Sequence, residues 1–562
     1  MSDIVKITAL GGLDESGRDC YVIEINDDIF VLDCGIGIPD KNIPGIDGIL
    51  PNAEYLIANK NRVKAYILTH GHDENMSGLK FFYEQAPAPI YCTHATRIFL
   101  EAESNIFNHK IQYVFVEVNP SSELIISNRK VKFFQTSHNA AFSFGVAIST
   151  DKGNIVYTSD FIVEYSARNP AYLFDLKGVS DLAEEETYIL LAESKTAHVP
   201  GYCAPKHRAR PLMEKYFKAN KRIFVNCFWQ NYFRISEIFA LCRDYKKRVY
   251  LYNDFTVKTI DNFLKILPNA YDRRNLISKE DLLRVRSSDV VILMIGVGEE
   301  VYTELSQIVE ERNEDIRIRF TPDDIFINAA IPTVNLETIA TRNIDNVYRS
   351  GCEVVWIKKK MISSMHACQD DLKYFLSALK PKYYLPVRGS FTHMMDNAKL
   401  AVSMSIGLNH SNIFILDNGM QLASDPITGR FSIIPNSVNK INVQPVLLDG
   451  KGTSKAGKAL VEQRKELAND GVVIVALTVS MKERKIIAGP DCQMRGFVYV
   501  KEAEPLLKTI SNYLVSEVTL AFDENRYDKE EISKNVIEKS RRFIKRDNGR
   551  EQLIIPIIVD VE

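Results

Sequence analysis

The sequence lacks any Cys-x-x-Cys pair, because its nine cysteines stand singly along the chain and are odd in number. This pattern argues against a disulfide framework and a thiolate zinc site, and it predicts reduced thiols within cores. The chain also lacks an apolar run approaching the roughly 18 residues of a membrane span, and it does not begin like a signal peptide. We therefore expect a cytoplasmic protein with no membrane partner.

A strong excess of charge of one sign is missing as well, since the formal net charge is −2. Binding to nucleic acid would then have to come from local patches rather than from the whole surface. With 46% apolar and 25% charged residues, the composition is that of an ordinary globular protein. A chain of 562 residues is too long for one core, so we expect about three domains.

Hydrophobic periodicity changes along the chain. Up to about residue 205, short β-rich runs separated by turn residues predict a sandwich of sheets with helices outside. Between residues 206 and 350, helical patterns alternate with apolar strands, which indicates a parallel α/β sheet. Residues 351 to 440 return to a strand, helix, strand order, and a small α+β unit follows from about residue 450. The predicted fold class is α/β.

Three apolar strand candidates end in a potential metal ligand: YILT is followed by His70, FFQTS by His138 and VYTS by Asp160. A lone histidine at a strand end is usually an ordinary surface or core residue. Three such ends, with His72 beside His70, instead favour one shared crevice. Three imidazole nitrogens and one carboxylate suit zinc or a similar divalent ion. Asp33, which ends IFVLD, is a natural acceptor to orient a ligand imidazole.

Several stretches carry a family resemblance: GGLDESGRDCYVIE, FVLDCG, ILTHGHDENMSGL, VYTSDF, KPKYYLPVRGS and GPDCQMRGFVYV. On these stretches the chain resembles the ribonuclease J family of bacterial metallo-β-lactamase/β-CASP ribonucleases, in the manner of a degenerate second paralogue. The resemblance implies a metallo-β-lactamase αββα sandwich, an inserted β-CASP α/β domain and a small C-terminal α+β domain. The implied boundaries are 1–205 and 351–440 for the lactamase domain, 206–350 for the β-CASP domain, 441–450 for a linker and 451–562 for a C-terminal assembly domain.

Members of the family hold two metal ions in a cleft between the lactamase and β-CASP domains, and the ions activate a water that attacks an RNA phosphodiester. The resemblance assigns the first ion to His70, His72, His138 and Asp160. The family's ligands for the second ion are replaced here by Glu74, Asn75 and Arg388. Arginine keeps its proton and cannot be a ligand. We therefore expect Arg388 to displace the second ion and to pair with Glu74. One zinc ion at most would remain, with manganese or magnesium as alternatives.

The residues that handle phosphate in the family are only partly kept. Ser364 and His366 persist in 362-ISSMHACQDD-371, but Met365 stands where the family has a glycine that lets backbone approach a phosphate. Asn231 and Arg234 persist in QNYFR, whereas the family's serine and histidine are replaced there. The resemblance implies RNA or phosphate contacts at the four residues that persist.

A basic run with few acidic residues stands at the start of the predicted β-CASP domain, and aromatic residues follow it. The run comprises Lys206, Arg208, Arg210, Lys215, Lys218, Lys221 and Arg222. Two interpretations stay open: a solvated helix face beside a core strand, or salt-dependent contact with RNA.

Three functions follow as hypotheses. The first is an RNA processing and decay protein of the ribonuclease J type, a family of 5′–3′ exo- and endoribonucleases. Its own nuclease activity would be weak or lost, and it would be the partner subunit of an active paralogue, in a homodimer or hetero-oligomer formed through the C-terminal domain. The second is an active one-metal ribonuclease in which Arg388 replaces the second ion. The third, hydrolysis of a small ester or lactam, is disfavoured by the β-CASP insertion.

The chemistry of arginine decides between the first two hypotheses. Arginine can stabilise developing phosphoryl charge, but it cannot lower the pKa of a bound water as a metal does. This favours the first hypothesis. Any catalytic role would fall to Asp160 and Glu74, with a weaker one for His366.

Overall fold

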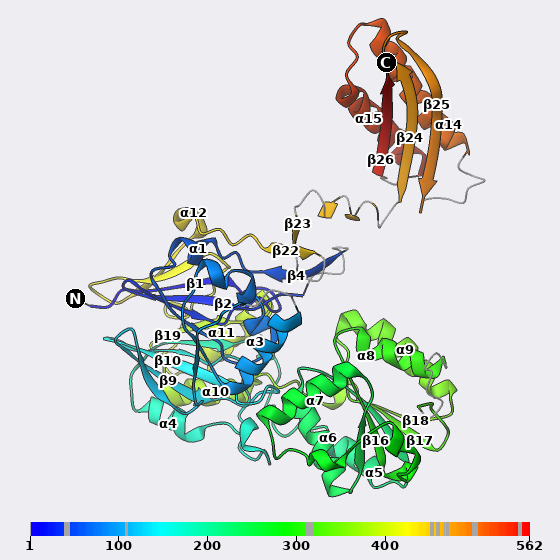
Figure 1. Cartoon of the computed structure of the whole chain (residues 1–562). Helices are drawn as coiled ribbons and strands as arrows, with labels where there is room; N and C mark the ends of the chain where they lie inside the picture. Colours follow the sequence, from blue (N-terminus) through cyan, green and yellow to red (C-terminus); the bar gives the residue numbers. More distant parts are fainter. Residues whose placement is uncertain are drawn as a thin grey trace. The chain divides into compact units, whose positions relative to one another are not determined.

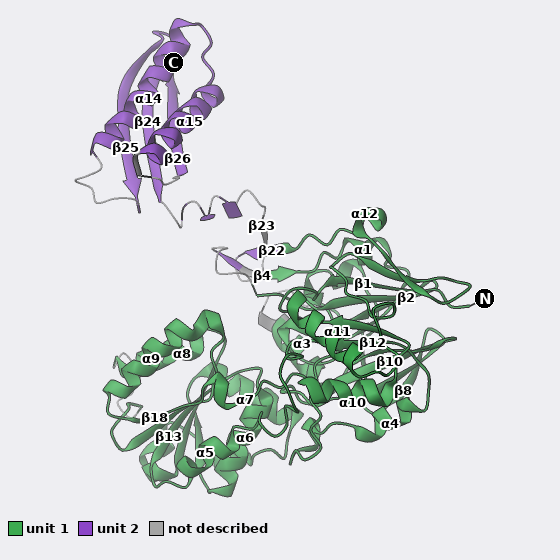
Figure 2. Cartoon of the chain, turned by 180° about the vertical axis from the view of Figure 1, so that it is seen from behind, with its two compact units in different colours: residues 1–38, 49–446 green, residues 39–48, 447–562 purple. Residues whose placement is uncertain are grey.

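The structure is a computed structural model (Figure 1). It describes residues 2–38, 45–106, 111–310, 318–449, 454–456, 461–462, 464–465, 467, 471–496, 504–548 and 553–562. The chain forms two compact units, one of residues 1–38 and 49–446 and the other of residues 39–48 and 447–562 (Figure 2). No helix in these described ranges is both long and apolar enough to cross a membrane.

Two β-sheets form a sandwich in the first unit. The first sheet runs β21 (Phe431–Ile434), β20 (Gln421–Ser424), β1 (Val5–Gly11), β2 (Cys20–Ile25), β3 (Asp28–Leu32), β5 (Val63–Ile67), β6 (Ile90–Cys92) and β7 (Phe115–Glu117). The second sheet runs β19 (Tyr383–Val387), β12 (Thr187–Glu193), β11 (Gly153–Tyr157), β10 (Phe144–Thr150), β9 (Arg129–Gln135) and β8 (Glu123–Ile126). Apolar side chains such as Ile7, Phe30, Val146 and Leu191 fill the space between them.

Helices cover the outer face of each sheet. On the first sheet, α1 (Glu54–Ala58) and α3 (His94–Ile106) contribute buried side chains to the same apolar cluster as β2, β3 and β5. On the second, α4 (Leu176–Ala183), α10 (Gln369–Leu379) and α11 (Phe391–Ser403) pack against β9 to β12 and β19. The expected αββα sandwich is confirmed, because each sheet buries one face against the other sheet and one face against helices.

A second lobe of the first unit is inserted between β12 and β19, which are parallel neighbours in the second sheet. Its sheet is wholly parallel, in the order β15 (Leu276–Ile277), β14 (Arg248–Leu251), β16 (Val290–Gly296), β13 (Arg222–Phe228), β17 (Asp324–Asn328) and β18 (Glu353–Trp356). The helices of this lobe are α5 (Arg210–Phe217), α6 (Tyr232–Asp244), α7 (Asp254–Ile266), α8 (Glu300–Val309) and α9 (Glu337–Arg349).

The end of this lobe differs from the sequence-based boundary at residue 350. The strand that contains Trp356 was expected in the returning part of the sandwich. It pairs instead with β17 and extends the parallel sheet. The composition of this strand could not show which sheet it joins, because buried strands of both sheets have the same apolar pattern.

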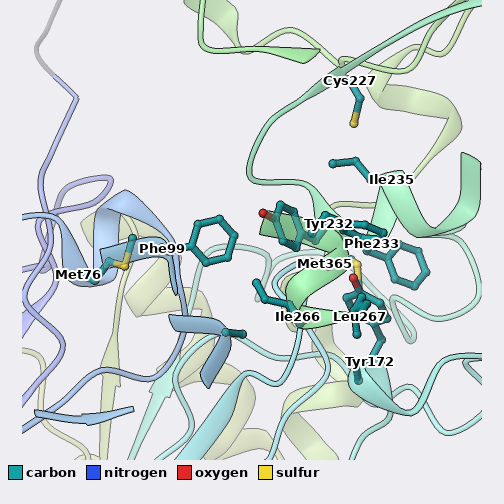
Figure 3. Packing of buried hydrophobic residues seen from close by; sticks show 14 of the residues in the cluster. Met76, Phe99, Tyr172, Cys227, Tyr232, Phe233, Ile235, Ile266, Leu267 and Met365 are labelled. Atoms are coloured by element: carbon teal, nitrogen blue, oxygen red, sulfur yellow. The ribbon is translucent and has the colours of Figure 1, made fainter. Parts of the chain in front are cut away.

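Aromatic side chains join the sandwich to the inserted lobe (Figure 3). The ring of Phe99 on α3 lies 4.8 Å from that of Tyr232 on α6, measured between centroids. Tyr172 of the sandwich lies 5.2 Å from Phe233 of α6, edge to face. The backbone N–H of Phe233 also donates a hydrogen bond to the carbonyl of Asn139. Together with the ring contacts, this bond holds the first turn of α6 beside the loop that carries His138.

The second unit contains a three-stranded sheet of β24 (Val472–Ser480), β25 (Lys485–Arg495) and β26 (Leu553–Val561). One face packs on helices α14 (Glu504–Asp523) and α15 (Lys529–Asn548). The expected linker at 441–450 is not free of regular structure. It contains β22 (Val446–Asp449), which lies between β4 (Ile46–Leu50) and β23 (Ser454–Ala456) in a small sheet.

Candidate metal centre

The four expected ligands lie together where strands of both sheets end. His70 follows β5 of the first sheet, whereas His138 and Asp160 follow β9 and β11 of the second. His72 directly precedes the short helix α2 (Asp73–Met76). All four side chains are buried, and one donor atom from each lies within 4.8 Å of every other. The strand ends thus converge as the sequence indicates.

Gly71 allows the two histidines of this loop to stand side by side. A Cβ at this position would lie 2.3 Å from the ring of Phe99, which packs against the loop. No side chain fits in that space, so the spacing of His70 and His72 depends on glycine between them.

The separations among the four donors match the ligand sphere of one small ion. His72 Nδ1 lies 3.1 Å from His70 Nε2 and 3.3 Å from His138 Nε2. Asp160 Oδ2 lies 3.6 Å from His70 Nε2 and 3.7 Å from His138 Nε2. Ligands held at about 2.0–2.2 Å around a tetrahedral zinc ion stand about 3.3–3.6 Å apart. The four separations given, 3.1 to 3.7 Å, are close to this range, so the donors suit a zinc-sized ion.

Hydrogen bonds behind two of the rings decide which nitrogen faces this position. His138 Nδ1 lies 2.7 Å from the carbonyl oxygen of Met365, which can only accept, so Nδ1 holds the proton and Nε2 is free. Thr69 Oγ1 donates to Asp33 at 2.9 Å and so accepts from His70 Nδ1 at 3.0 Å. Asp33 therefore orients His70 through Thr69 and not by direct contact.

Burial keeps the three imidazoles neutral. Loss of hydration is the largest cause of their pKa shifts, and it lowers the pKa of His72 to about 4 and those of His70 and His138 well below the usual range. A proton on His72 Nδ1 could serve only one of its two neighbouring nitrogens. A cation serves all three nitrogens and the carboxylate at once, so the chemistry of the donors also fits a metal.

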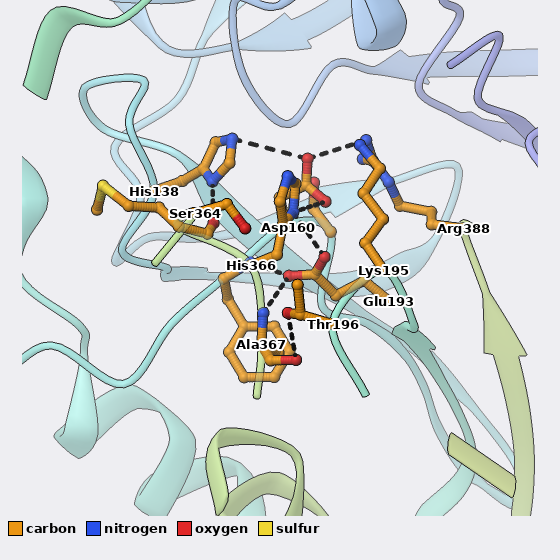
Figure 4. Close-up of polar contacts among 12 residues, drawn as sticks. His138, Asp160, Glu193, Lys195, Thr196, Ser364, His366, Ala367 and Arg388 are labelled. Carbon is orange, nitrogen blue, oxygen red and sulfur yellow. Dashed lines mark hydrogen bonds and ion pairs between the residues drawn. The ribbon is translucent and has the colours of Figure 1, made fainter. Parts of the chain in front are cut away.

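Arg388 lies on the other side of Asp160 (Figure 4). Its side chain is fully buried, and its Nη2 stands 2.9 Å from Asp160 Oδ2, 2.8 Å from Asp19 Oδ2 and 3.0 Å from Glu74 Oε1. The ion pair expected between Arg388 and Glu74 is therefore present. Asp160 Oδ2 faces the histidines on one side and the guanidinium on the other.

Three strand ends around the centre have a left-handed backbone. The φ angles are 58° at Asp33, 55° at Ser159 and 59° at Arg388. This conformation costs free energy for residues other than glycine and is typically kept where a side chain must be aimed. It marks these strand ends as positions shaped by the site.

Two charged residues of the centre escape the sequence analysis. Lys195 follows β12, and its Nζ lies 2.6 Å from Glu74 Oε1. It stands just past a strand end, as His138 does, but a lysine is not a usual metal ligand, so this position alone does not mark it. Asp19 precedes β2, and no pattern marks it. Burial alone would raise the pKa of Glu74, but the charges of Lys195 and Arg388 outweigh burial and hold it well below the usual range.

Asn75, which stands in place of a family ligand, turns away from this cluster. Its Nδ2 donates to Asp33 Oδ2 at 2.9 Å, and its backbone carbonyl accepts from Cys34. Its side chain therefore supports the oxygen network around Asp33 and Thr69.

His366 connects Asp160 to Glu193 (Figure 4). Its Nδ1 lies 2.8 Å from Glu193 Oε2 and 3.3 Å from Asp160 Oδ1. Burial lowers the pKa of His366, but the two carboxylates more than offset this and raise it to about 9. The same three residues have the spacing of a metal-binding group. The proton on His366 Nδ1 is donated to Glu193, and Asp160 Oδ1 has no hydrogen-bond partner among the described residues.

The other expected phosphate contacts are divided. Ser364 is exposed beside His366. Asn231 caps α6 by accepting from the backbone N–H of Arg234, and the buried guanidinium of Arg234 pairs with Glu237. Ser364 and His366 are thus brought to the metal ligands, whereas Asn231 and Arg234 already have partners in their own lobe.

Much of the basic run is paired with carboxylates. Arg208 lies 2.6 Å from Glu164, and Arg210 lies 2.7 Å from Asp244. Arg222 lies 2.7 Å from Asp324 and Lys221 lies 3.4 Å from Glu353. These pairs favour the interpretation of the run as a structural surface at these four positions.

The sandwich, the inserted parallel lobe and the buried three-histidine, one-carboxylate centre together define a protein of the metallo-β-lactamase fold with a candidate metal centre. Residues 355–411 match the model of a Zn-dependent metallo-hydrolase RNA specificity domain, and residues 459–561 match the ribonuclease J C-terminal domain. The chain is 30% identical to "Ribonuclease J 2" of Staphylococcus epidermidis, over 99% of this chain and 98% of that one. It is 29% identical to "Ribonuclease J 2" of Staphylococcus aureus over the same shares. The chain therefore belongs to the ribonuclease J family.

The fold is also present in a solved structure. It is the crystal structure of a protein of unknown function from Enterococcus faecalis V583, which is 14% identical. The match covers 75% of this chain and 100% of that one with a TM-score of 0.51. At this identity it shows similarity of fold alone.

Proposed function

We propose that this chain is an RNA-binding subunit of the ribonuclease J type, whose own nuclease activity is weak or lost. The observation that carries the proposal is the position of Arg388 Nη2, 2.9 Å from Asp160 Oδ2. A second ion would need that oxygen and Glu74 as ligands, and a buried guanidinium cannot share the space with it. Two-ion phosphoryl chemistry needs both ions, one for the attacking and one for the leaving oxygen.

A single zinc ion is the proposed cofactor, held by His70, His72, His138 and Asp160, with manganese or magnesium as alternatives. Such an ion supplies a Lewis acid and lowers the pKa of a bound water. The chain's own residues would do the rest. His366 and Glu193 hold Asp160 in place from behind, and Thr69 keeps His70 in the required tautomer.

RNA contact is proposed at Ser364 and His366 first, because Ser364 is exposed and the His366 side chain is 18% exposed at the edge of the centre. Asn231 and Arg234 are proposed as supports that position the first turn of α6, in keeping with their bonds within the lobe. Substitutions at the first pair should weaken RNA binding, whereas substitutions at the second pair should weaken folding as well.

Assembly with an active paralogue, or with a second copy, is proposed through the C-terminal domain at 451–562. The sheet of the second unit carries an apolar outer face, on which alternate residues of β26 point away from the helices. Ile555, Ile557, Val559 and Val561 are 38%, 42%, 48% and 44% exposed. A row of this kind is typical of a surface that another protein covers. Sedimentation of the chain alone and mixed with an intact ribonuclease J, with Ile557→Asp as the matched variant, tests this.

Degradation of a 5′-monophosphorylated RNA, labelled at either end, tests the nuclease part of the proposal. The purified chain is assayed in zinc, manganese or magnesium beside Asp160→Ala. We expect RNA to be bound and not cut beyond the level of that control. Cleavage that Asp160→Ala abolishes would contradict the proposal.

That contrary outcome would support a second candidate, an active one-metal ribonuclease. One observation favours it: Arg388 Nη1 and Nε are buried and have no hydrogen-bond partner among the described residues. They could donate to a phosphate as charge develops on it. Under this candidate Arg388→Lys should lose cleavage while it keeps RNA binding, because a lysine cannot reproduce the planar fork.

A further inference from the structure

Three carboxylate oxygens surround one nitrogen of Arg388. Asp19 Oδ2, Asp160 Oδ2 and Glu74 Oε1 lie 2.8, 2.9 and 3.0 Å from Nη2. An NH2 group carries two hydrogens, so it cannot donate a hydrogen bond to all three oxygens. Only the contact with Glu74 has hydrogen-bond geometry; the other two oxygens have no hydrogen-bond partner among the described residues. Their arrangement is therefore that of ligands gathered around a cation.

Lys195 adds a second positive charge to the same oxygens. Its Nζ lies 2.6 Å from Glu74 Oε1, which is the oxygen that Arg388 also contacts. The two cations come from neighbouring strand ends, because β12 and β19 are parallel partners and the Ser194 N–H donates to the Arg388 carbonyl at 3.1 Å. The sheet itself thus holds both side chains against the carboxylates.

The charges of this cluster match those of a metal site. Arg388 and Lys195 bring two positive charges to the carboxyl groups of Asp19, Glu74 and Asp160, as one divalent ion would. Arg388 is fully buried and the Lys195 side chain is only 17% exposed, so solvent does little to neutralise the carboxylates in their place.

We infer that Asp19, Glu74 and Asp160 form a latent, oxygen-only metal site, and that Arg388 and Lys195 jointly take the place of its divalent ion. The inference rests on the proposed function in one respect, that no second ion binds the natural chain. An all-oxygen site takes hard cations such as Mn²⁺ or Mg²⁺, so it differs in its preferred metal from the histidine centre beside it. Lys195 acts as a positioning residue, since its Nζ contacts Glu74 Oε1 at 2.6 Å and no other oxygen of the three.

Counting bound Mn²⁺ on full-length variants tests the inference. Methionine is close to both side chains in length and carries no charge, so Arg388→Met/Lys195→Met exposes the carboxylates without filling the space with a ligand. We expect this double variant to bind one more Mn²⁺ per chain than the natural protein, measured by electron paramagnetic resonance and total metal analysis. Its unfolding temperature should rise with Mn²⁺ more than that of the natural protein.

The single variants separate the two cations. Lys195→Met should bind no additional ion, because Arg388 still fills the site. Arg388→Met should bind the additional ion at least about tenfold more weakly than the double variant, because the retained lysine opposes it. Arg388→Met/Lys195→Arg keeps that charge and should behave like Arg388→Met. Lys399→Met, at a lysine that is 71% exposed on α11, is the control and should match the natural protein.

Three results would overturn the inference. The double variant could bind no more Mn²⁺ than the natural chain, which would mean that no latent site exists. Arg388→Met could bind the additional ion as tightly as the double variant, which would leave Lys195 without a role. The natural chain could bind two ions, for instance with one at Asp160, Glu193 and His366, and His366→Gln would then remove it.

A double variant that does not fold without metal still answers the question. Refolding in Mn²⁺ but not in chelator would support the latent site, and failure in both would overturn it. Cleavage of RNA by the natural chain would contradict the proposed function and leave these counts unaffected, so the two failures are distinguishable.

Discussion

On one side of Asp160 stand three neutral imidazoles, and on the other stand an arginine and a lysine among carboxylates. The imidazole nitrogens lie 3.1 and 3.3 Å apart, and only a cation from solution could be bound by all three of them at once. The charged side brings its own cations, with contacts of 2.6 to 3.0 Å. Side chains therefore supply positive charge on one side of Asp160, whereas the other side can obtain it only from a bound ion.

The largest effect should follow from breaking the charged side. Arg388→Ala leaves the buried carboxylates of Asp19 and Asp160, and the partly exposed one of Glu74, without their main counter-charge and should cost about 3–5 kcal/mol of unfolding free energy. Urea denaturation of the zinc-loaded protein measures it. Lys177→Ala removes a lysine that is 83% exposed and paired with Asp181, and it should leave the denaturation curve nearly unchanged. Equal losses in the two variants would show that the buried cluster contributes no more than a surface pair.

Removal of zinc should destabilise only the histidine side of Asp160. Binding stabilises the folded chain by about 2.7 kcal/mol when free zinc is about 100 times its Kd. Chelation should therefore lower the unfolding temperature of the natural protein. It should have no such effect on His138→Ala, in which one of the four ligands is missing. A zinc-dependent shift that persists in His138→Ala would place the ion elsewhere.

The two sides also differ in how far sequence could predict them. His70, His138 and Asp160 follow from a local pattern, because each stands just past an apolar strand and such ends meet. Arg388 could be assigned only through the family resemblance, since an arginine after a strand has no meaning alone. Asp19 reaches the centre from the loop before β2, and that contact depends on how two distant segments pack. The same holds for β18, whose partner sheet no local pattern specifies.

Burial also dominates the pKa of a histidine outside the centre, His207, although a carboxylate oxygen of Glu164 lies 3.3 Å from its Nε2. His207 is 1% exposed, and loss of hydration lowers its pKa to about 4. In the unfolded chain the imidazole of His207 gains a proton near pH 6.5, whereas in the folded chain it gains that proton only near pH 4. Stability is therefore present above pH 6.5 and is lost as the pH falls through this window, by about 2–3 kcal/mol from this residue.

In His207→Leu the free energy of unfolding should fall less steeply as the pH is lowered from 6.5 to 4. The difference between the natural and variant unfolding free energies, measured in chelator from pH 8 to pH 4, isolates His207 from the three imidazoles of the centre. The two curves should run parallel above pH 7 and converge or cross below it. Parallel curves throughout would show that His207 gains its proton in the folded state as readily as in the unfolded state.

The smallest effect should come from Lys195, and its size sharpens the comparison between a fully buried cation and a nearly buried one. Lys195 makes one short contact, to Glu74, and its side chain is 17% exposed, so water can partly replace its charge. Lys195→Met should therefore cost only about 1 kcal/mol, and Lys195→Arg less than that, because it keeps the charge within reach of Glu74. Urea denaturation beside Arg388→Ala measures both. If Lys195→Met lost as much unfolding free energy as Arg388→Ala, the two cations would stabilise the carboxylates equally. No loss at all would mean that Arg388 alone replaces the ion.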